Sequence, residues 1–225
     1  EGLKNAGFRI TTNSWLDAFD ALYETELEKL NQELQAEAVK TGIDCIHILY
    51  ERPHILQACQ DITQRDISSA GTDTAIYVLT RKEGEGRDNR FVEGEYLPAK
   101  WEFTHLRQLR DSFSTLVLLL NIASPIDMKD ILEIGPDAIL LMFQGGAEIG
   151  NATADMLTGA CPPSGKLTNT WAKDYWDYPN SATFGSNGGD PIDKEYREGI
   201  YVGYRYFDSF DVTPQYPFGY GLSYT

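Results

Sequence analysis

Short apolar runs divide the chain at intervals. The runs at residues 75–80, 114–122 and 137–143 are too short for amphipathic helices, and the first of them, AIYVLT, is rich in β-forming residues. Such runs are typical of strands that are buried on both faces, as in a parallel sheet. Each of the three is therefore predicted to be a strand of the core.

Other segments repeat their apolar residues with a helical period. A long helix is predicted to begin with Ser14 as its N-cap and to stop at Gly42. A second is predicted after Pro98, and a third over residues 147–158, ending before Gly159. The apolar faces of the first two helices are formed by Phe19, Tyr23, Leu27, Leu30 and Leu34, and by Leu106, Leu109 and Phe113.

The alternation of short apolar strands with amphipathic helices predicts an α/β fold. Its expected form is a three-layer sandwich, in which a mostly parallel sheet carries helices on both faces. The tail at residues 175–225 is crowded with Tyr, Gly, Pro and Asp and is predicted to be rich in loops. It holds too many aromatic side chains to leave in water, so it is expected to pack back on the α/β body. Residues 1–225 are interpreted as one domain.

Three further segments carry weaker patterns. GFRITT, at residues 7–12, is interpreted as a short strand, and GKLTNTW, at residues 165–171, as an edge strand. CIHILY, at residues 45–50, resembles a strand and is followed by a break at Pro53 and a short helix before Ser69.

Charge and composition exclude several classes of partner. The net charge is −15, which disfavours nucleic acid and anionic membranes and carries no penalty for neutral substrates. The longest apolar run, near residues 116–120, is far shorter than the ~20 residues that cross a bilayer. The scattered cysteines and histidines match no metal-ligand or disulfide spacing, so no metal and no cofactor are expected; they are Cys45, Cys59, Cys161, His47, His54 and His105.

Two loops follow predicted strands at the edge where parallel sheets bind ligands. QGGAEIG, at residues 144–150, has two glycines that could expose backbone N–H groups to a phosphate, but it matches no nucleotide motif and is interpreted as a plain strand-to-helix turn. RKEGEGRDNR, at residues 81–90, has seven charged residues and places Glu85 between two glycines. From composition alone it is either a solvated turn or a loop that presents one carboxyl group to a substrate, and the first interpretation is favoured.

Several segments, which follow one another along the chain, together favour the second interpretation of this loop. They are EGLKNAGF near the start, GEGRD in the charged loop, LLLNIASPIDM, DAILLMFQGGAEIGNATADMLTGACPPSGKLTNTW, YREGIYVGYRYFD and YPFGYGLSYT. Spread over nearly the whole chain, they resemble the α/β-sandwich domain of glycoside hydrolase family 3, the family of many β-glucosidases and β-xylosidases.

The resemblance implies a retaining β-glycosidase, most simply a β-glucosidase. Such enzymes use a carboxylate nucleophile and a second carboxyl group that acts first as acid and then as base. Carried over from the family's loop, the acid/base is Glu85, and Arg87 is a candidate contact to the substrate. The nucleophile belongs to a (β/α)-barrel domain that nothing in this sequence resembles, so the chain alone is expected to be inactive. The implied partners are a β-glucoside or related oligosaccharide and that barrel.

The chain departs from the family pattern at several positions. Glu83 replaces a frequent serine, Asn89 interrupts a frequent Asp-Arg pair, Phe143 replaces Trp or Tyr, and Thr168 replaces proline. A strand that generally precedes EGLKNAGF is also missing, so the sheet is expected to lack its first strand.

Two other functions stay open at this point. The departures at Glu83 and Asn89 are compatible with a non-catalytic carbohydrate-binding or scaffold domain of the same family. The strand pattern also fits a flavodoxin-like nucleotide or flavin binder, although the phosphate fingerprint of that class is missing.

Overall fold

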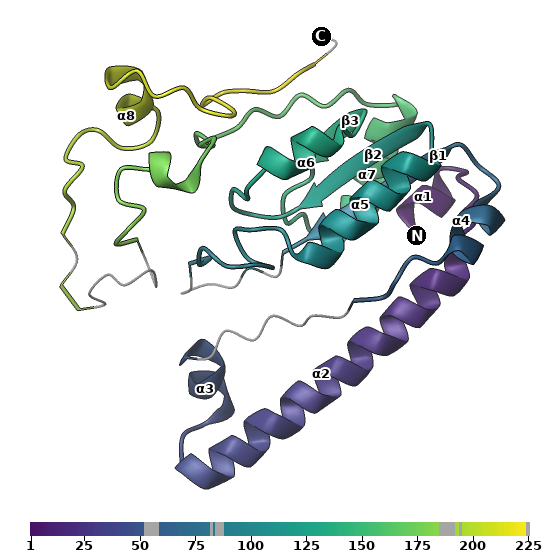
Figure 1. Cartoon of the computed structure of the whole chain (residues 1–225), viewed down its shortest axis with the longest axis horizontal. Coiled ribbons are helices and arrows are strands. Elements are labelled where there is room, and N and C mark those ends of the chain that lie inside the picture. Colours follow the sequence, from purple (N-terminus) through teal and green to yellow (C-terminus); the bar gives the residue numbers. More distant parts are fainter. Residues whose placement is uncertain (52–58, 82, 84–87, 185–191, 194, 224–225) are drawn as a thin grey trace. The chain divides into compact units, whose positions relative to one another are not determined.

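The computed structural model describes residues 1–51, 59–81, 83, 88–184, 192–193 and 195–223. The chain forms two compact units: a sheet unit made of Glu1–Arg9 with Thr74–Thr225, and a helical unit made of Ile10–Asp73. All three strands of the described residues lie in the sheet unit (Figure 1).

The helical unit contains α2 (Asn13–Thr41), α3 (Cys45–Glu51) and α4 (Gln64–Ala70). The predicted long helix is confirmed, and it ends at Gly42, whose φ of 73° lies in the left-handed region that glycine adopts readily. Its N-cap is Thr12, two residues before the predicted Ser14. Leu34 of α2 and Ile48 of α3 are buried, and these two helices pack against each other.

The predicted strand at residues 45–50 is wrong, because these residues form α3. The carboxylate of Asp44 accepts hydrogen bonds from the backbone N–H groups of Ile46 and His47, at 3.0 and 3.1 Å. An aspartate in this position satisfies the free donors of a first helical turn. The apolar run fits a helix or a strand, and Asp44 decides for the helix.

The sheet unit is built on three parallel strands in the order β1 (Thr74–Thr80), β2 (Thr115–Asn121) and β3 (Ala138–Leu141). All three predicted strands are confirmed. Helices α5 (Lys100–Ser112) and α6 (Lys129–Ile134) form the two crossovers and lie on one face of the sheet, as right-handed connections in one direction require (Figure 1). Helices α1 (Gly2–Asn5) and α7 (Ile149–Thr158) lie on the other face, which confirms the three-layer α/β prediction.

The central strand forms the core of the sheet unit. Leu116 and Leu118 of β2 are fully buried, and Leu120 is 2% exposed. Leu79 of β1 and Leu106 of α5 pack at 1% exposure each. A strand covered on both faces needs apolar residues at successive positions, which explains the LVLLL run.

An ionic contact fixes the start of β2. The carboxylate of Asp137 accepts hydrogen bonds from the Leu116 N–H at 2.7 Å and from the Arg110 guanidinium of α5 at 2.5 Å. These two donors lower the pKa of Asp137 below its ordinary value of 3.8. The charged form is therefore favoured in the folded state.

We expect Asp137→Asn to weaken the pH dependence of stability in acid. A carboxylate with a lowered folded-state pKa stabilises the fold above its ordinary pKa, and this contribution is lost as the pH falls through the folded-state value. The melting temperatures of wild type and variant should therefore converge as the pH falls from about 5 to about 2. A difference that stays constant over this range, in melting curves followed by circular dichroism, would contradict the assignment.

Helices α1 and α7 approach each other through two glycines. A Cβ added to Gly2 would lie 2.0 Å from the carbonyl carbon of Gly150, so no larger residue fits there. After α1, Gly7 adopts a φ of 88°, and the Phe8 N–H bonds back to the Leu3 carbonyl at 2.9 Å. Residues 8–12 then lead directly to α2, so the strand predicted at residues 7–12 is wrong.

The tail also differs in part from its prediction. Residues 165–171 form no regular strand; Trp171 makes an isolated antiparallel bridge with Tyr216. Tyr175, in the 3₁₀ helix η1 (Tyr175–Asp177), is buried and stacks on Phe91 with ring centroids 4.6 Å apart, which confirms that the tail packs back on the body. Around α8 (Tyr204–Ser209), however, many apolar side chains stay exposed, including Tyr196, Ile200, Val202, Phe210 and Phe218.

Candidate functional site

Three loops gather at the carboxyl ends of the parallel strands, which is where open α/β sheets bind ligands. They follow Thr80 of β1, Asn121 of β2 and Leu141 of β3. The side-chain amide of Gln144 donates to the Arg81 carbonyl at 3.2 Å, so the two loops singled out by sequence are in contact.

The charged loop begins with a buried arginine. Arg81 is 5% exposed, and its guanidinium makes a two-pronged ion pair with Glu102 of α5, at 2.7 and 2.8 Å. Glu102 also accepts a hydrogen bond from the Ala99 N–H at 2.7 Å and thereby caps its own helix. The interpretation of the whole loop as a solvated turn is therefore wrong at Arg81, because this residue is buried. The ion pair with Glu102 compensates for the burial of its charge.

Glu95 holds both ends of the same loop. Its backbone carbonyl accepts from Nε of Arg81 at 2.8 Å. Its buried carboxylate accepts from the backbone N–H of Arg90 at 2.5 Å and from the Arg90 guanidinium at 2.7 Å. The first and last residues of RKEGEGRDNR are thus fixed by one glutamate.

Glu83 has a role that the sequence did not reveal. Its half-buried carboxylate reaches the turn after β2, where it accepts hydrogen bonds from the backbone N–H groups of Ala123 at 2.5 Å and Ser124 at 3.0 Å. The Ser124 hydroxyl donates to the other carboxylate oxygen at 2.5 Å. The only signal that could have suggested this contact is positional, because the loops after neighbouring parallel strands lie side by side.

The two sequence-predicted site residues, Glu85 and Arg87, lie outside the described residues. The structure does describe the flanking positions Glu83 and Asp88, and Asp88 is exposed. The structure therefore describes the residues that flank the predicted acid/base in the sequence.

The second loop is a strand-to-helix turn, as interpreted from sequence. Helix α7 starts at Ile149, and its N-cap is Glu148, whose carboxylate accepts from the Asn151 amide at 2.6 Å. This carboxylate places a negative charge beside the N-terminus of α7, where it would repel a phosphate. The arrangement therefore disfavours the phosphate-cradle alternative.

The sheet unit also has an open hollow beside this turn, with a volume of about 520 Å³. It is lined mostly by apolar side chains of β3, the glycine turn and α7, among them Leu141, Ile149 and Met156. None of its lining residues belongs to the charged loop, so it is a separate feature from the predicted site.

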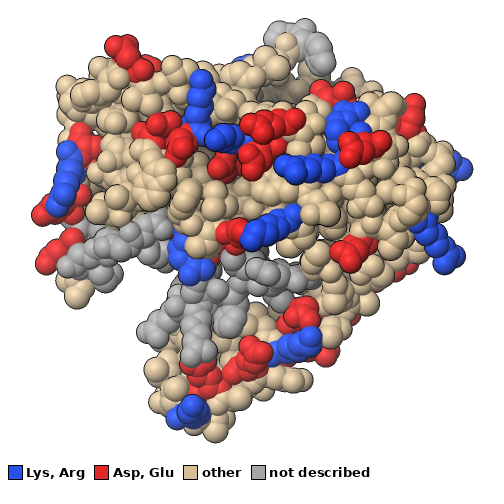
Figure 2. All heavy atoms as spheres, viewed as in Figure 1, with Lys and Arg blue, Asp and Glu red and all other residues tan. Residues whose placement is uncertain are grey.

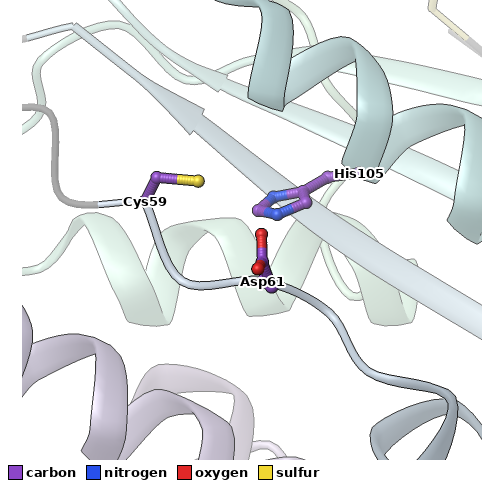
Figure 3. Close-up of side chains that lie close together, drawn as sticks. All are labelled: Cys59, Asp61 and His105. Carbon is purple, nitrogen blue, oxygen red and sulfur yellow. The ribbon is translucent and has the colours of Figure 1, made fainter.

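Figure 3 draws side chains from both units. In the sheet unit, His105 projects from α5 and is 2% exposed, with the Tyr77 hydroxyl 3.3 Å from its Nδ1 atom. In the helical unit, Cys59 and Asp61 lie on the segment before α4, and burial raises the pKa of the Cys59 thiol. We assign no metal centre to residues of different units; His54 lies outside the described residues.

Charged side chains are mixed over the visible surface. On the face in Figure 2, acidic residues are interspersed with Lys and Arg instead of forming one acidic patch. Among the helices that the structure describes, none has the length and apolar character needed to cross a membrane.

Comparison with known proteins decides the family. Residues 9–224 match the model of the glycosyl hydrolase family 3 C-terminal domain. The chain belongs to glycoside hydrolase family 3. This match confirms the resemblance carried by the sequence motifs.

Similar proteins of known name support the same family 3 assignment. A β-glucosidase of Ruminococcus albus is 45% identical over 159 residues, which cover 70% of this chain and 16% of that protein. The thermostable β-glucosidase B of Acetivibrio thermocellus is 28% identical over 215 residues, covering 89% of this chain and 26% of that protein. This family 3 domain therefore spans about a quarter or less of these relatives.

The fold has a matching solved structure. The β-glucosidase 3B of Thermotoga neapolitana, solved in complex with α-D-glucose, aligns with a TM-score of 0.69 and 36% sequence identity. The alignment covers 84% of this family 3 domain and 28% of that chain.

Proposed function

We propose that this chain is the acid/base-bearing C-terminal domain of a longer retaining β-glucosidase. The match of residues 9–224 to the family's C-terminal domain carries the proposal, and the β-glucosidase names of its relatives support the activity. The substrate class is a β-glucoside or a related oligosaccharide. The partner domain is a (β/α)-barrel that supplies the nucleophile, and the reaction needs no metal or cofactor.

In this proposal Glu85 is the general acid and then the general base. It first protonates the leaving-group oxygen and later takes a proton from water that attacks the glycosyl-enzyme. Retention requires the two carboxyl groups to lie ~5–5.5 Å apart, a spacing that two domains can create across their interface. Arg87 is the candidate contact to the part of the substrate that leaves.

A non-catalytic family member is the second candidate function, and the departures at Glu83 and Asn89 are the features that are compatible with it. These residues are hydrogen bonded to each other, with the Asn89 amide 2.6 Å from the Glu83 carboxylate. The two departures thus form one contact beside residues 84–88 instead of two unrelated changes, and this supports the catalytic proposal.

The test compares the 225-residue chain with the full-length protein on an aryl β-glucoside. We expect turnover only from the full-length protein, because the isolated chain has no nucleophile with which to form the covalent intermediate. Hydrolysis by the isolated chain would contradict the two-domain mechanism.

A crystal structure of the full-length protein with a glucose-like ligand should place the Glu85 carboxyl group beside the anomeric centre. A Glu85 carboxyl group remote from that centre would remove this residue from the mechanism.

A further inference from the structure

Glu83 and Asn89, which both depart from the family pattern, are hydrogen bonded to each other in the sheet unit. The Glu83 carboxylate accepts four hydrogen bonds, from two backbone N–H groups, from the Ser124 hydroxyl and from the Asn89 amide. A carboxylate is a pure acceptor with about four lone-pair sites, so this arrangement saturates it.

Asn89 and Ser124 complete the network. The Asn89 amide also donates to the Ser124 hydroxyl at 2.8 Å, and this hydroxyl in turn donates to Glu83. The donors and acceptors of the network match: Asn89 donates two hydrogen bonds, Ser124 donates one and accepts one, and Glu83 only accepts. All three side chains are half-buried, which protects these bonds from competition with water.

The network fixes two positions that enclose the family's loop. Glu83 stands immediately before residues 84–88 and Asn89 immediately after them, and both are bonded to Ser124 in the turn after β2. A serine at position 83 has too short a side chain to reach two backbone N–H groups and an amide together. The larger residue at 83 and the added amide at 89 therefore act as one device.

We propose that Glu83, Asn89 and Ser124 form a clamp that positions the acid/base residue between them. The proposal rests on the proposed function of Glu85. Within it, Glu83 is a positioning residue: its carboxylate is engaged by four protein donors, and with Asn89 it fixes the two positions that flank the acid/base segment.

The test exchanges the two clamp groups in the full-length protein. Asn89→Asp places two carboxylates face to face and should open the clamp, whereas Glu83→Gln/Asn89→Asp restores one amide and one carboxylate with the same net charge as the wild type. In the double variant the new amide at position 83 can donate to the new carboxylate at position 89, while the amide oxygen still accepts from Ala123 and Ser124.

The readout is the dependence on the leaving group, because only a poor leaving group needs a well-placed general acid. A displacement of about 1 Å can cost on the order of 10²-fold, so we expect kcat/KM for an alkyl β-glucoside to fall about 10- to 100-fold in Asn89→Asp. The value for a dinitrophenyl β-glucoside should change by less than about threefold, and the double variant should recover most of the loss. Equal losses on both substrates, or no recovery in the double variant, would overturn the clamp.

Two controls separate this proposal from the one on which it rests. Glu85→Ala should show the same leaving-group dependence in stronger form; if it does and Asn89→Asp does not, the clamp alone is wrong. If Glu85→Ala has normal activity on both substrates, the proposed acid/base is wrong and the clamp falls with it. Glu133→Gln, at an exposed glutamate of α6, should leave both substrates unchanged.

Discussion

Replacing Glu85 with alanine in the full-length protein should lower turnover of an aryl β-glucoside by about 10²- to 10⁴-fold. This is the range expected when a positioned general acid–base is lost. Alanine cannot deprotonate the water that attacks the glycosyl-enzyme, so the intermediate should accumulate when the leaving group is good. A burst of released phenol followed by a slow steady rate is the kinetic sign to measure.

Azide should restore the turnover of this variant. A small anion can enter the space left by the side chain and attack the intermediate without a base, giving a β-glycosyl azide. The azide must act only in Glu85→Ala; the wild type and Glu133→Ala serve as controls. A variant that keeps normal turnover without azide would show that Glu85 is not the acid/base.

The second large effect is expected from the buried Arg81–Glu102 pair. Arg81→Met leaves the Glu102 carboxylate buried without its partner, and breaking such a pair typically costs about 3–5 kcal/mol. Domains of ordinary stability have about 5–15 kcal/mol in total, so a substantial part should be lost. Urea unfolding of wild type and variant gives the difference directly.

A double-variant cycle distinguishes the pair from its packing. Glu102→Leu alone leaves Arg81 unpaired and should be destabilising, whereas Arg81→Met/Glu102→Leu removes both charges and should lose much less than the sum of the two single changes. Additive losses would mean that the two side chains act independently, despite two contacts of 2.7 and 2.8 Å.

The parts of the fold that were predicted correctly have strong local patterns. The successive apolar residues of β2 are typical of a strand covered on both faces, and the long period that ends at Gly42 is typical of a helix. The segment at residues 45–50 has no such period, so the cap at Asp44 decided its structure.

The contacts of the candidate site were harder to predict from sequence, because its hydrogen bonds join residues that are far apart along the chain. The position of the charged loop follows from the strand before it, but the burial of Arg81 depends on Glu102, and the role of Glu83 depends on Ser124. No pattern within RKEGEGRDNR specifies either partner. Sequence therefore identified the loop, and the structure explained why four of its residues have the types they have.

The hydrogen bonds from Arg81 and Arg90 to Glu95 reduce the conformational entropy that these positions can lose when a ligand binds. Fixing the backbone of one residue costs about 1–2 kcal/mol of conformational entropy. At positions that the fold already holds, this entropy is lost on folding and not on ligand binding. In the proposed enzyme, a sugar would not have to order these positions when it binds, and less of its interaction energy would be consumed in doing so. In the proposed enzyme, that energy remains available for contacts that strengthen as the glycosidic bond breaks.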